Sequence, residues 1–498
     1  MNRTRCLAST FATVVLSAAL SSATEPIDVG DRVCLFLDDR FVAKQVGLER
    51  TWHQGKPLEN PAIASSDLVD RWPHLFGSVV YDPQDKLYKM WYSSIREGMF
   101  YAESRDGKAW SKPKLGIHTV DGSKDNNLVS PAVALPNVFL DPNEKDPKAR
   151  FKLFAWDTSY YSKLPIEERA NGHKLFRSGD GIHWDPVGAG VPGSLVASSD
   201  RCSNFICSDT NQVIWDSLAG RYLVTFRTYP KHWPEGEFEA GRRRSIGITT
   251  AQQITGPWQP IVKSVVPDEQ DDKAAALAMR DVPPDSKKWA ELYVMPLFTY
   301  GNHYVGLLSP IHVANVGNGK LVANAPGGGD LQLAFSHDGM KWHRPAERPP
   351  LIAPSTAAEL HPVYAACSAP LEMDKEIWIY YAEANSSHPS EKDPKAQIRA
   401  AAWRKDGFVS LDTEGKGSLT TPPLVFTGKQ LRVNFQGSVT VTVLDDREQR
   451  IESLSPQTLT GDSVAQAVEW DMSTLAGRPI RLRFDVEKGH LWSFRFAP

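Results

Sequence analysis

A short motif that joins an Asp-Gly turn to a tryptophan recurs along this 498-residue chain and constrains its fold most strongly. Three copies, each reading Ser-x-Asp-Gly-x-x-Trp, end at Trp110, Trp184 and Trp342. A looser copy ends at Trp258, and a weaker one lies at 404–408. The four tryptophans are 74, 74 and 84 residues apart, and a recurring period of this kind indicates a repeat architecture.

The motif predicts a hairpin turn in every repeat. Glycine supplies the positive φ of a tight two-residue turn, and the Asp or Ser side chain can bond the turn's own amides. The tryptophan then starts the next strand and packs between neighbouring sheets. We therefore expect a structural role for these aspartates rather than a catalytic one.

Alternating apolar segments precede each turn and complete a unit of four antiparallel strands. In the first repeat they are 75–82, 88–93 and 99–104, and in the fourth they are 274–279, 291–298 and 330–336. Five such units predict an all-β fold, a five-bladed β-propeller. The 35 glycines and 36 prolines fit this prediction, because many short strands need many tight turns.

Long connections follow the second strand of each predicted blade, at 93–98, 157–173, 229–241, 299–329 and 383–395. In a propeller the first strand runs down the central channel and the second strand returns, so these connections should all open on one channel mouth. Loops gathered on one face of a rigid scaffold commonly carry binding sites. Solvated insertions without a function are the alternative.

The pattern changes after residue 428. Five alternating segments there predict a small antiparallel β-sandwich, which is too small to carry the main chemistry. The predicted organisation is a signal peptide at 1–23, the five-bladed β-propeller at 24–428 and the C-terminal β-sandwich at 429–498.

The first 23 residues are typical of a secretory signal. Arg3 and Arg5 precede a mostly apolar stretch at 6–20, and small residues at 21–23 form a cleavage site. A membrane anchor is the alternative, but the stretch is short and interrupted by Ser and Thr. No later run is long and apolar enough to span a bilayer. We expect a secreted or periplasmic protein that has no membrane association after signal removal.

Four cysteines remain after the predicted signal: Cys34, Cys202, Cys207 and Cys367. An oxidising compartment permits disulfides, and three pairings are open. Cys202 and Cys207 are close enough in sequence to clip one loop, while buried free thiols are an equal alternative. Zinc is not expected, because the chain has no Cys-x-x-Cys or His-x-x-x-His pair.

The charge balance excludes one class of partner. The chain has 56 basic and 59 acidic residues and a net charge of −3. A general nucleic-acid binder needs a basic excess to neutralise phosphates, so nucleic acid is not an expected partner. Hydrophobic residues make up 41%, which allows a buried core and excludes wholesale disorder.

Five blades, the Asp-Gly-x-x-Trp and Gly-Pro-Trp turns and a trailing β-sandwich together resemble the clan of glycoside hydrolase families 32, 43 and 68. Segments 114–116, 126–127, 209–216 and 404–408 resemble those of a poorly characterised, secreted bacterial subgroup that is family-32-like. The resemblance covers roughly residues 30–498. It implies an oligo- or polysaccharide substrate and carboxylates at the channel mouth. No cofactor is expected, although the resemblance allows a calcium ion in the channel.

Glycoside hydrolysis needs two carboxyl groups, one protonated as the acid and one ionised as the nucleophile or base. The resemblance implies that they lie near the starts of first strands. We predict Asp209 as nucleophile or base, Glu359 as acid and Asp272 as a residue that tunes the pair. Asp209 could instead cap a strand, and Asp272 belongs to an acidic run at 268–272 that could simply be solvated.

Ten further residues are candidates for substrate binding. Histidines could bind hydroxyls, arginines could meet a carboxylate or sulfate of an acidic sugar, and aromatic rings could stack on apolar sugar faces. The candidates are Trp72, His74, Asp157, Arg201, Arg227, Tyr300, His303, His361, Glu383 and His388. No metal ligands are predicted. Structural histidines, a solvated basic loop and core packing are the alternatives.

Two functions from different classes follow. The first is a secreted glycoside hydrolase, a glycosidase that acts on a plant, algal or host glycan. The second is a non-catalytic carbohydrate-binding or scaffolding propeller, which the absence of Trp-x-Asn-Asp-Pro, Arg-Asp-Pro and Glu-Cys favours. Mouth carboxyls about 5–9.5 Å apart would favour hydrolysis, and a channel plugged by apolar side chains would favour binding alone. A sialidase-like enzyme or a lyase would require converging arginines in the channel.

Overall fold

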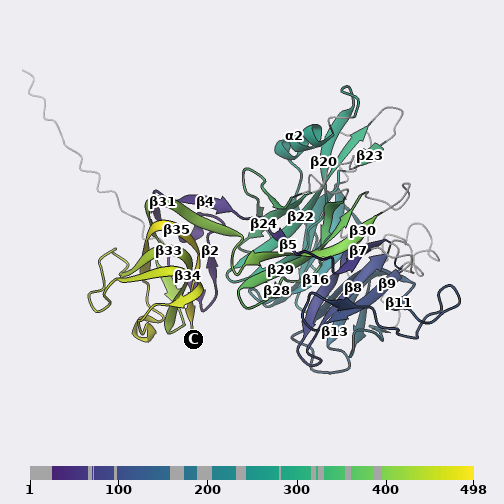
Figure 1. The fold of residues 1–498 in the computed structure, drawn as a ribbon, viewed down its shortest axis with the longest axis horizontal. Coiled ribbons are helices and arrows are strands. Elements are labelled where there is room, and N and C mark those ends of the chain that lie inside the picture. The colour runs from purple at the N-terminus through teal and green to yellow at the C-terminus, as the bar shows by residue number, and fades with distance from the viewer. Residues whose placement is uncertain are drawn as a thin grey trace, which may run out of the picture.

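The structure is a computed structural model. It describes residues 25–64, 70, 72–94, 98–157, 173–187, 205–230, 243–279, 282–315, 321–323, 330–353, 360–385 and 395–498. This part of the chain is almost entirely β-structure and contains one α-helix, α2 (Glu269–Ala278). Five sheets form a propeller, and a β-sandwich lies beside it (Figure 1). The predicted signal at 1–23 lies outside the described residues.

The five-bladed prediction is confirmed, because five antiparallel sheets each place their first strand at a common axis. Blade 1 contains β7 (Pro73–Asp82), β8 (Leu87–Ser94), β9 (Gly98–Ser104) and β10 (Trp110–Ser111). Blade 2 contains β12 (Val133–Leu140), β13 (Phe151–Asp157), β14 (His173–Ser178) and β15 (Asp185–Pro186). Blade 3 contains β16 (Phe205–Asp216), β17 (Arg221–Pro230), β18 (Ser245–Ala251) and β19 (Val262–Val265).

Blades 4 and 5 have additional short strands. Blade 4 contains β20 (Lys287–Val294), β21 (Leu297–Tyr300), β22 (His303–Asn315), β24 (Leu331–Ser336) and β25 (Trp342–His343). Blade 5 contains β27 (His361–Ala365), β28 (Leu371–Glu372), β29 (Glu376–Ala384) and β30 (Ala396–Arg404). Three further strands extend blades 1 and 4: β11 (Leu128–Ser130), β23 (Leu321–Ala323) and β26 (Pro350–Ile352).

Blade 4 differs from the prediction. Residues 274–279, expected as its first strand, belong to helix α2. Asp268 caps this helix in a reciprocal capping box with Asp271, and alanine-rich sequence follows, both of which favour a helix. The first strand is therefore β20, and the expected mouth loop at 299–329 contains the long strand β22.

The amino-terminal segment closes the ring. Strands β5 (Lys56–Pro57) and β6 (Ile63–Ala64) pair antiparallel with β30 and supply the outer strand of blade 5. The chain after the weak repeat at 404–408 leaves the propeller instead, as β31 (Val409–Thr420). Pairing of the first and last parts of the propeller protects the edge that an open ring would expose.

The three clear Asp-Gly turns share one set of hydrogen bonds. In blade 1, Ser104 Oγ accepts from the amides of Asp106 and Gly107, and Asp106 Oδ1 accepts from the next two amides at 2.8 and 2.9 Å. Trp110 Nε1 donates to the carbonyl of Gly107 at 3.1 Å. The predicted structural role of these side chains is confirmed. The predicted two-residue turn is wrong, because Trp110 pairs with Ser104 and leaves a five-residue loop.

Each turn also contacts the preceding blade. Trp91 of β8 donates its indole N–H to the carbonyl of Gly181 in the blade 2 turn at 2.6 Å. Tyr380 of β29 likewise donates its hydroxyl to the carbonyl of Gly107 in the blade 1 turn. The local motif therefore ends one hairpin and also fixes the angle between neighbouring blades.

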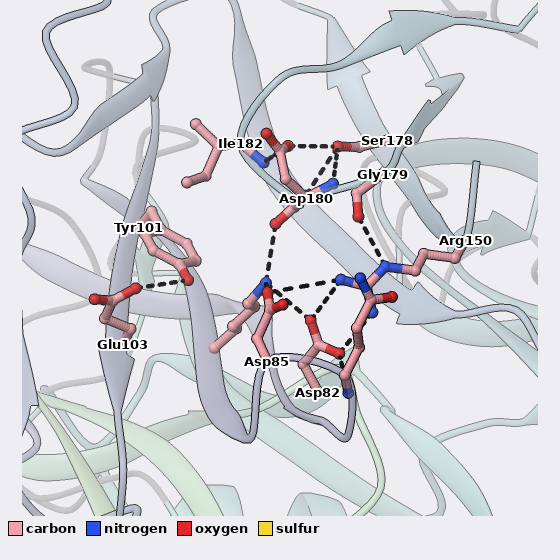
Figure 2. Close-up of polar contacts among 12 residues, drawn as sticks. Asp82, Asp85, Tyr101, Glu103, Arg150, Ser178, Gly179, Asp180 and Ile182 are labelled. Carbon is pink, nitrogen blue, oxygen red and sulfur yellow. Dashed lines mark hydrogen bonds and ion pairs between the residues drawn. The ribbon is translucent and has the colours of Figure 1, made fainter. Parts of the chain in front are cut away.

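A charged cluster joins blades 1 and 2 at the same end of the propeller (Figure 2). Arg150 makes two parallel hydrogen bonds to the fully buried Asp82, at 2.6 and 2.7 Å. Lys89 bridges Asp82 at 2.9 Å and Asp85 at 2.6 Å, and it also donates to the carbonyl of Asp180. Opposite charges and fixed carbonyls thus satisfy this buried cluster.

A ring of polar groups joins the blades around the propeller axis. The carbonyl of Cys367 accepts from Ser78 Oγ at 3.2 Å and from Asn137 Nδ2 at 2.8 Å. Asn137 Oδ1 accepts from a blade 3 amide at 2.6 Å, and Gln212 Nε2 donates to the carbonyl of Leu297 at 2.9 Å. All five blades contribute to this polar ring, which links them to one another around the axis.

The C-terminal sandwich uses strands from both ends of the chain (Figure 1). Its sheet contains β31, β33 (Gln430–Leu444), β34 (Gln457–Ala467) and β35 (Arg481–Ala497), with β2 (Cys34–Leu35), β3 (Lys44–Val46) and β4 (Glu49–Trp52). A parallel pair, β1 (Ile27–Gly30) and β32 (Leu424–Phe426), completes it. Residues on both sides of position 428 share this sheet, and a domain boundary there stays a prediction.

Two sequence predictions concern the environment of the chain. Cys34 and Cys367 are buried free thiols, so a bridge between Cys202 and Cys207 is the pairing that stays open. Cys202 and the side chain of Cys207 lie outside the described residues. Within the described ranges, no helix has the length and apolar character needed to cross a bilayer.

Candidate active site

The channel mouth is the end of the propeller at which the first strands begin and the second strands finish. Every first strand changes register on this side of the polar ring, for example between His74 and Ser78 in β7 and between Cys207 and Asn211 in β16. Such irregularities bend a strand and redirect its side chains.

Aromatic rings line the mouth from blade 1 to blade 4. The ring centroids of Trp72 and His74 are 5.2 Å apart, as are those of His74 and Phe76. Phe76 then contacts Tyr293 of β20 across the channel at 5.9 Å. Burial lowers the pKa of His74 to about 4, so its ring is neutral at neutral pH.

Two of these rings, Phe76 and Tyr293, belong to an apolar cluster that forms the floor of the mouth. Phe76 and Val294 are buried against each other, with Leu135 and Tyr293 packed beside them. These side chains come from blades 1, 2 and 4 and separate the mouth from the polar ring. A ligand at the mouth would thus meet aromatic and aliphatic surface underneath and polar groups around the side.

Glu291 of β20 is a buried acidic residue at the mouth. Only 5% of this residue is exposed. Trp289 donates its indole N–H to one carboxyl oxygen at 3.1 Å, and Arg244 lies 3.2 Å from the other. Burial raises the pKa of Glu291, while the charge of Arg244 and the Trp289 hydrogen bond oppose the rise. A carboxyl that holds its proton above its ordinary pH range is suited to act as a general acid.

Two arginines converge on Tyr293, which follows Glu291 on the same face of the strand. The guanidinium carbon of Arg227 lies 4.3 Å from the Tyr293 ring centroid, and that of Arg244 lies 5.4 Å away. Arg227 is buried and comes from β17 of blade 3. This side of the mouth therefore combines cationic, aromatic and acidic groups within contact distance.

A backbone clamp holds Glu291 in place. Asp272 of helix α2 accepts from the amide of Ala290 at 2.9 Å and pairs with Arg243. Arg243 donates in turn to the carbonyl of Ala290 at 3.0 Å, and the amide of Leu292 donates to the carbonyl of the residue after Arg243. The residues on both sides of Glu291 are thus tied to blade 3 and to the helix.

The structure brings several predicted substrate-binding residues to the mouth. Trp72 and His74 lie in blade 1, and Arg227 lies in blade 3. His361 of β27 and Glu383 of β29 lie in blade 5, one residue out of register with each other across the paired strands. The Glu383 carboxylate accepts from Tyr381 at 3.0 Å and from Gln397 at 2.7 Å.

Two predicted residues lie elsewhere. Tyr300 and His303 form a hairpin at the opposite end of blade 4, because β21 runs away from the mouth. Tyr300 donates to Asp406 at 2.7 Å, and burial followed by this negative charge raises its pKa. His303 is buried against Phe41, and burial lowers its pKa to about 3. Both residues contact the amino-terminal and blade 5 segments rather than the mouth.

The predicted catalytic residues are placed only in part. Asp272 lies on helix α2 in the clamp described above. The backbone of Asp209 lies in the irregular part of β16, at the mouth, but its side chain lies outside the described residues. Glu359 lies outside them entirely. The same holds for Arg201 and His388, and for the side chain of Asp157 at the end of β13.

Sequence reasoning missed Glu291. The segment Trp289-Ala-Glu-Leu-Tyr293 does alternate, and a carboxylate between two aromatic residues of a predicted strand is an unusual signal. The prediction places the first strand at 274–279 and the second at 291–298, so it assigns Glu291 to a second strand. Only a first strand faces the channel.

Within the described ranges, no three His, Cys, Asp or Glu side chains are grouped to hold a metal ion. The described residues therefore offer no group of ligands for the calcium ion that the resemblance allows.

Comparisons with known proteins give relatives in fold. No family model matches the chain, and no curated protein matches it. It is similar to a solved putative glycosidase from Bacteroides thetaiotaomicron, at 11% identity and a TM-score of 0.41, over 71% of this chain and 97% of that one.

Two other solved structures illustrate the range of activities. The catalytic domain of a GH62 α-L-arabinofuranosidase from Coprinopsis cinerea has 11% identity and a TM-score of 0.37, over 70% of this chain and 97% of that one. An N-acetylgalactosamine deacetylase from F. plautii, in complex with blood group B trisaccharide, has 11% identity and a TM-score of 0.38, over 72% and 96%. Function has to be argued from the residues of the site.

Proposed function

We propose that this chain is a glycosidase that hydrolyses a glycosidic bond at the propeller mouth, with Glu291 as the proton donor. The observation that carries the proposal is the buried Glu291 carboxyl, whose pKa is raised by burial beside Trp289 and Arg244. Such a carboxyl can deliver its proton to the leaving oxygen of a glycoside as the C1–O bond breaks.

The second carboxyl in this proposal is Asp209 of the adjacent blade 3. As an ionised group it either attacks C1 or removes a proton from the attacking water, and the water supplies the hydroxyl that C1 gains. Trp72, His74, Arg227 and His361 would contact sugar rings and hydroxyls around the bond. Export through the predicted signal and action on a plant, algal or host glycan complete the proposal.

The test compares leaving groups. Glu291→Gln removes the proton donor but keeps the side-chain volume, so hydrolysis of unactivated oligosaccharides should fall about 100- to 10,000-fold. An aryl glycoside with an acidic phenol as the leaving group needs little protonation and should lose far less. Glu269→Gln, an exposed carboxylate on helix α2, is the matched control and should be unchanged.

The other predicted carboxyls enter the same assay. Asp209→Asn should abolish turnover of both substrates, because attack at C1 does not depend on the leaving group. Full loss of oligosaccharide hydrolysis in Glu359→Gln, with normal rates in Glu291→Gln, would transfer the acid role to Glu359 and overturn the assignment of Glu291.

The pH profile gives an independent test of Glu291. A general acid works below its own pKa, so activity should be lost as pH rises through the raised pKa of Glu291. Arg244→Gln removes a charge that favours the carboxylate, and the basic limb should move to higher pH. A basic limb that moves to lower pH, or stays in place, would contradict the assignment.

Non-catalytic carbohydrate binding is the second candidate, and one observation favours it. Apolar side chains of Phe76, Leu135 and Val294 close the channel beneath the mouth. Calorimetric binding of an oligosaccharide with no release of reducing ends over days, unchanged by Glu291→Gln, would favour this function over hydrolysis.

A further inference from the structure

A second concave site lies on the axis, at the end of the propeller opposite the mouth. It is a cup of about 620 Å³ lined by the far ends of the first strands. Each blade supplies apolar side chains to its wall: Val80 and Tyr81, Phe139 and Leu140, Ile214 and Trp215, Phe298, and Pro370 and Leu371. We call these residues the axial cup.

The axial cup is separate from the mouth. Its floor is the polar ring, in which Asn137 Nδ2 donates to the carbonyl of Cys367 at 2.8 Å and Ser78 Oγ donates to the same carbonyl at 3.2 Å. Phe76 and Val294 then close the channel on the other side of that ring. A ligand in the cup therefore occupies a site of its own.

The lining of the axial cup is apolar where a propeller face would ordinarily be polar. Tyr81 is 43% exposed, although its ring centroid lies 4.9 Å from that of Tyr88, with the two rings tilted by 50°. Phe139 and Trp215 are each partly exposed at the wall. Exposed apolar surface gathered in one hollow, rather than scattered singly, is typical of a binding site.

Few polar groups enter the axial cup. Ser368 Oγ accepts from the amide of Val79 at 3.1 Å, so its hydroxyl proton can be offered to a ligand. Thr299 shares a hydrogen bond with Ser217 at 3.2 Å. Glu372, the charged residue of the lining, forms an ion pair with Lys405 at 3.0 Å. The cup therefore offers a ligand apolar surface and one or two hydroxyls, while its charged residue Glu372 is already paired with Lys405.

We propose that the axial cup binds a neutral small molecule that contains an aromatic or fused aliphatic ring and one hydrogen-bond acceptor. The volume fits the usual range of about 300–1,000 Å³ for small-molecule sites. A sugar would require several side-chain hydrogen-bond partners for its hydroxyls, and the described lining residues supply few. A second copy of the chain would meet a hollow rather than the flat patch of a stable interface.

The proposal is tested with N-phenyl-1-naphthylamine, a neutral two-ring probe whose fluorescence rises in apolar surroundings. Titration of the full chain should give saturable binding of one probe per chain, with a dissociation constant on the order of micromolar. Tyr81→Asp places a charge on an exposed wall position and should weaken binding at least about tenfold. Leu277→Asp, at a surface position that is 72% exposed on helix α2, should leave binding unchanged.

Trp215→Phe supplies a second readout that does not depend on loss of binding. Excitation of the chain at the tryptophan band should transfer energy to the bound probe, and this transfer should fall in Trp215→Phe while the dissociation constant stays similar. Non-saturable fluorescence, or equal affinity in Tyr81→Asp and the unaltered chain, would overturn the proposal. If the sedimentation coefficient of the chain increases with protein concentration, the proposal is overturned in favour of self-association. Glu291→Gln should not affect probe binding, so the outcome is independent of the glycosidase assignment.

Discussion

The two ends of the propeller channel differ in how they use charge. At the end opposite the mouth, the Asp82 carboxylate forms ion pairs with Arg150 and Lys89 (Figure 2). At the mouth, Glu291 is buried beside one close cation and one indole donor, and its pKa is raised. One end keeps a carboxylate ionised, and the other favours its protonated form.

This difference separates stability from chemistry in one scaffold. Burial would raise the pKa of Asp82, but hydrogen bonds from Arg150 and Lys89 outweigh it and hold the pKa well below its usual range. No comparable set of donors surrounds Glu291 in the described part of the mouth. The charged cluster at the end opposite the mouth fixes blades 1 and 2 in register, while the mouth favours the protonated form of a buried carboxyl.

The largest expected effect concerns the charged cluster around Asp82, at the end opposite the mouth. Asp82→Asn removes the charge that two buried cations share, and we expect a loss of about 3–5 kcal/mol in unfolding free energy. Asp85→Asn, the partly exposed member of the same cluster, should cost less than about 1 kcal/mol. Urea unfolding followed by tryptophan fluorescence measures both. Equal losses in the two variants would show that burial does not govern this cluster.

A smaller effect is expected for the clamp behind Glu291. Asp272→Asn keeps an oxygen for the amide of Ala290 but loses the ion pair with Arg243. We expect kcat to fall about tenfold, roughly 1.4 kcal/mol, with little change in KM, because the position of Glu291 loosens and substrate contacts remain. The basic limb of the pH profile should also move, which a purely structural role would not produce. Glu269→Gln on the same helix is the control.

The smallest effect concerns the contact between the amino-terminal segment and blade 4. Burial alone would raise the pKa of Asp38, but hydrogen bonds from His337, at 2.7 Å, and from the Arg40 amide lower it to about 2. A carboxyl with a lowered pKa stabilises the fold above its ordinary pKa, and this contribution is lost as pH falls from about 4 to 2.

Asp38→Asn should therefore reduce stability at pH 5–7 by less than about 1 kcal/mol, since the pair is partly exposed. It should also flatten the dependence of the thermal midpoint on pH between about 4 and 2. Asp39→Asn, whose side chain is mostly exposed, is the control. An unchanged slope in Asp38→Asn would mean that His337 does not hold this carboxylate in solution.

The repeat was predictable because its signal is local. Ser104, Asp106, Gly107 and Trp110 bond one another within seven residues, so the same letters return wherever the same hairpin is needed. Five copies of that hairpin predict five blades. The error in blade 4 was local as well, since a capped, alanine-rich run at 269–278 carries a helix signal that alternation alone does not separate from a strand.

The candidate site was not predictable to the same degree. Glu291 is distinguished by burial and by Arg227, Arg243 and Arg244, which come from another blade. Trp72 and His74 immediately precede or begin the first strand of blade 1, and their role in substrate binding stays a prediction. Tyr300 and His303 were misplaced together with the strand that carries them.

The amino-acid sequence by itself determined the repeated hairpin, the number of blades and the all-β class, since each follows from contacts between residues close together in the chain. Tertiary structure alone decided that residues 27–52 join the carboxyl-terminal sandwich and that 56–64 complete the fifth blade. It also decided that the Glu291 carboxyl is buried at the mouth. Burial and charge pairing depend on segments that are distant in sequence, and these meet only when the ring closes.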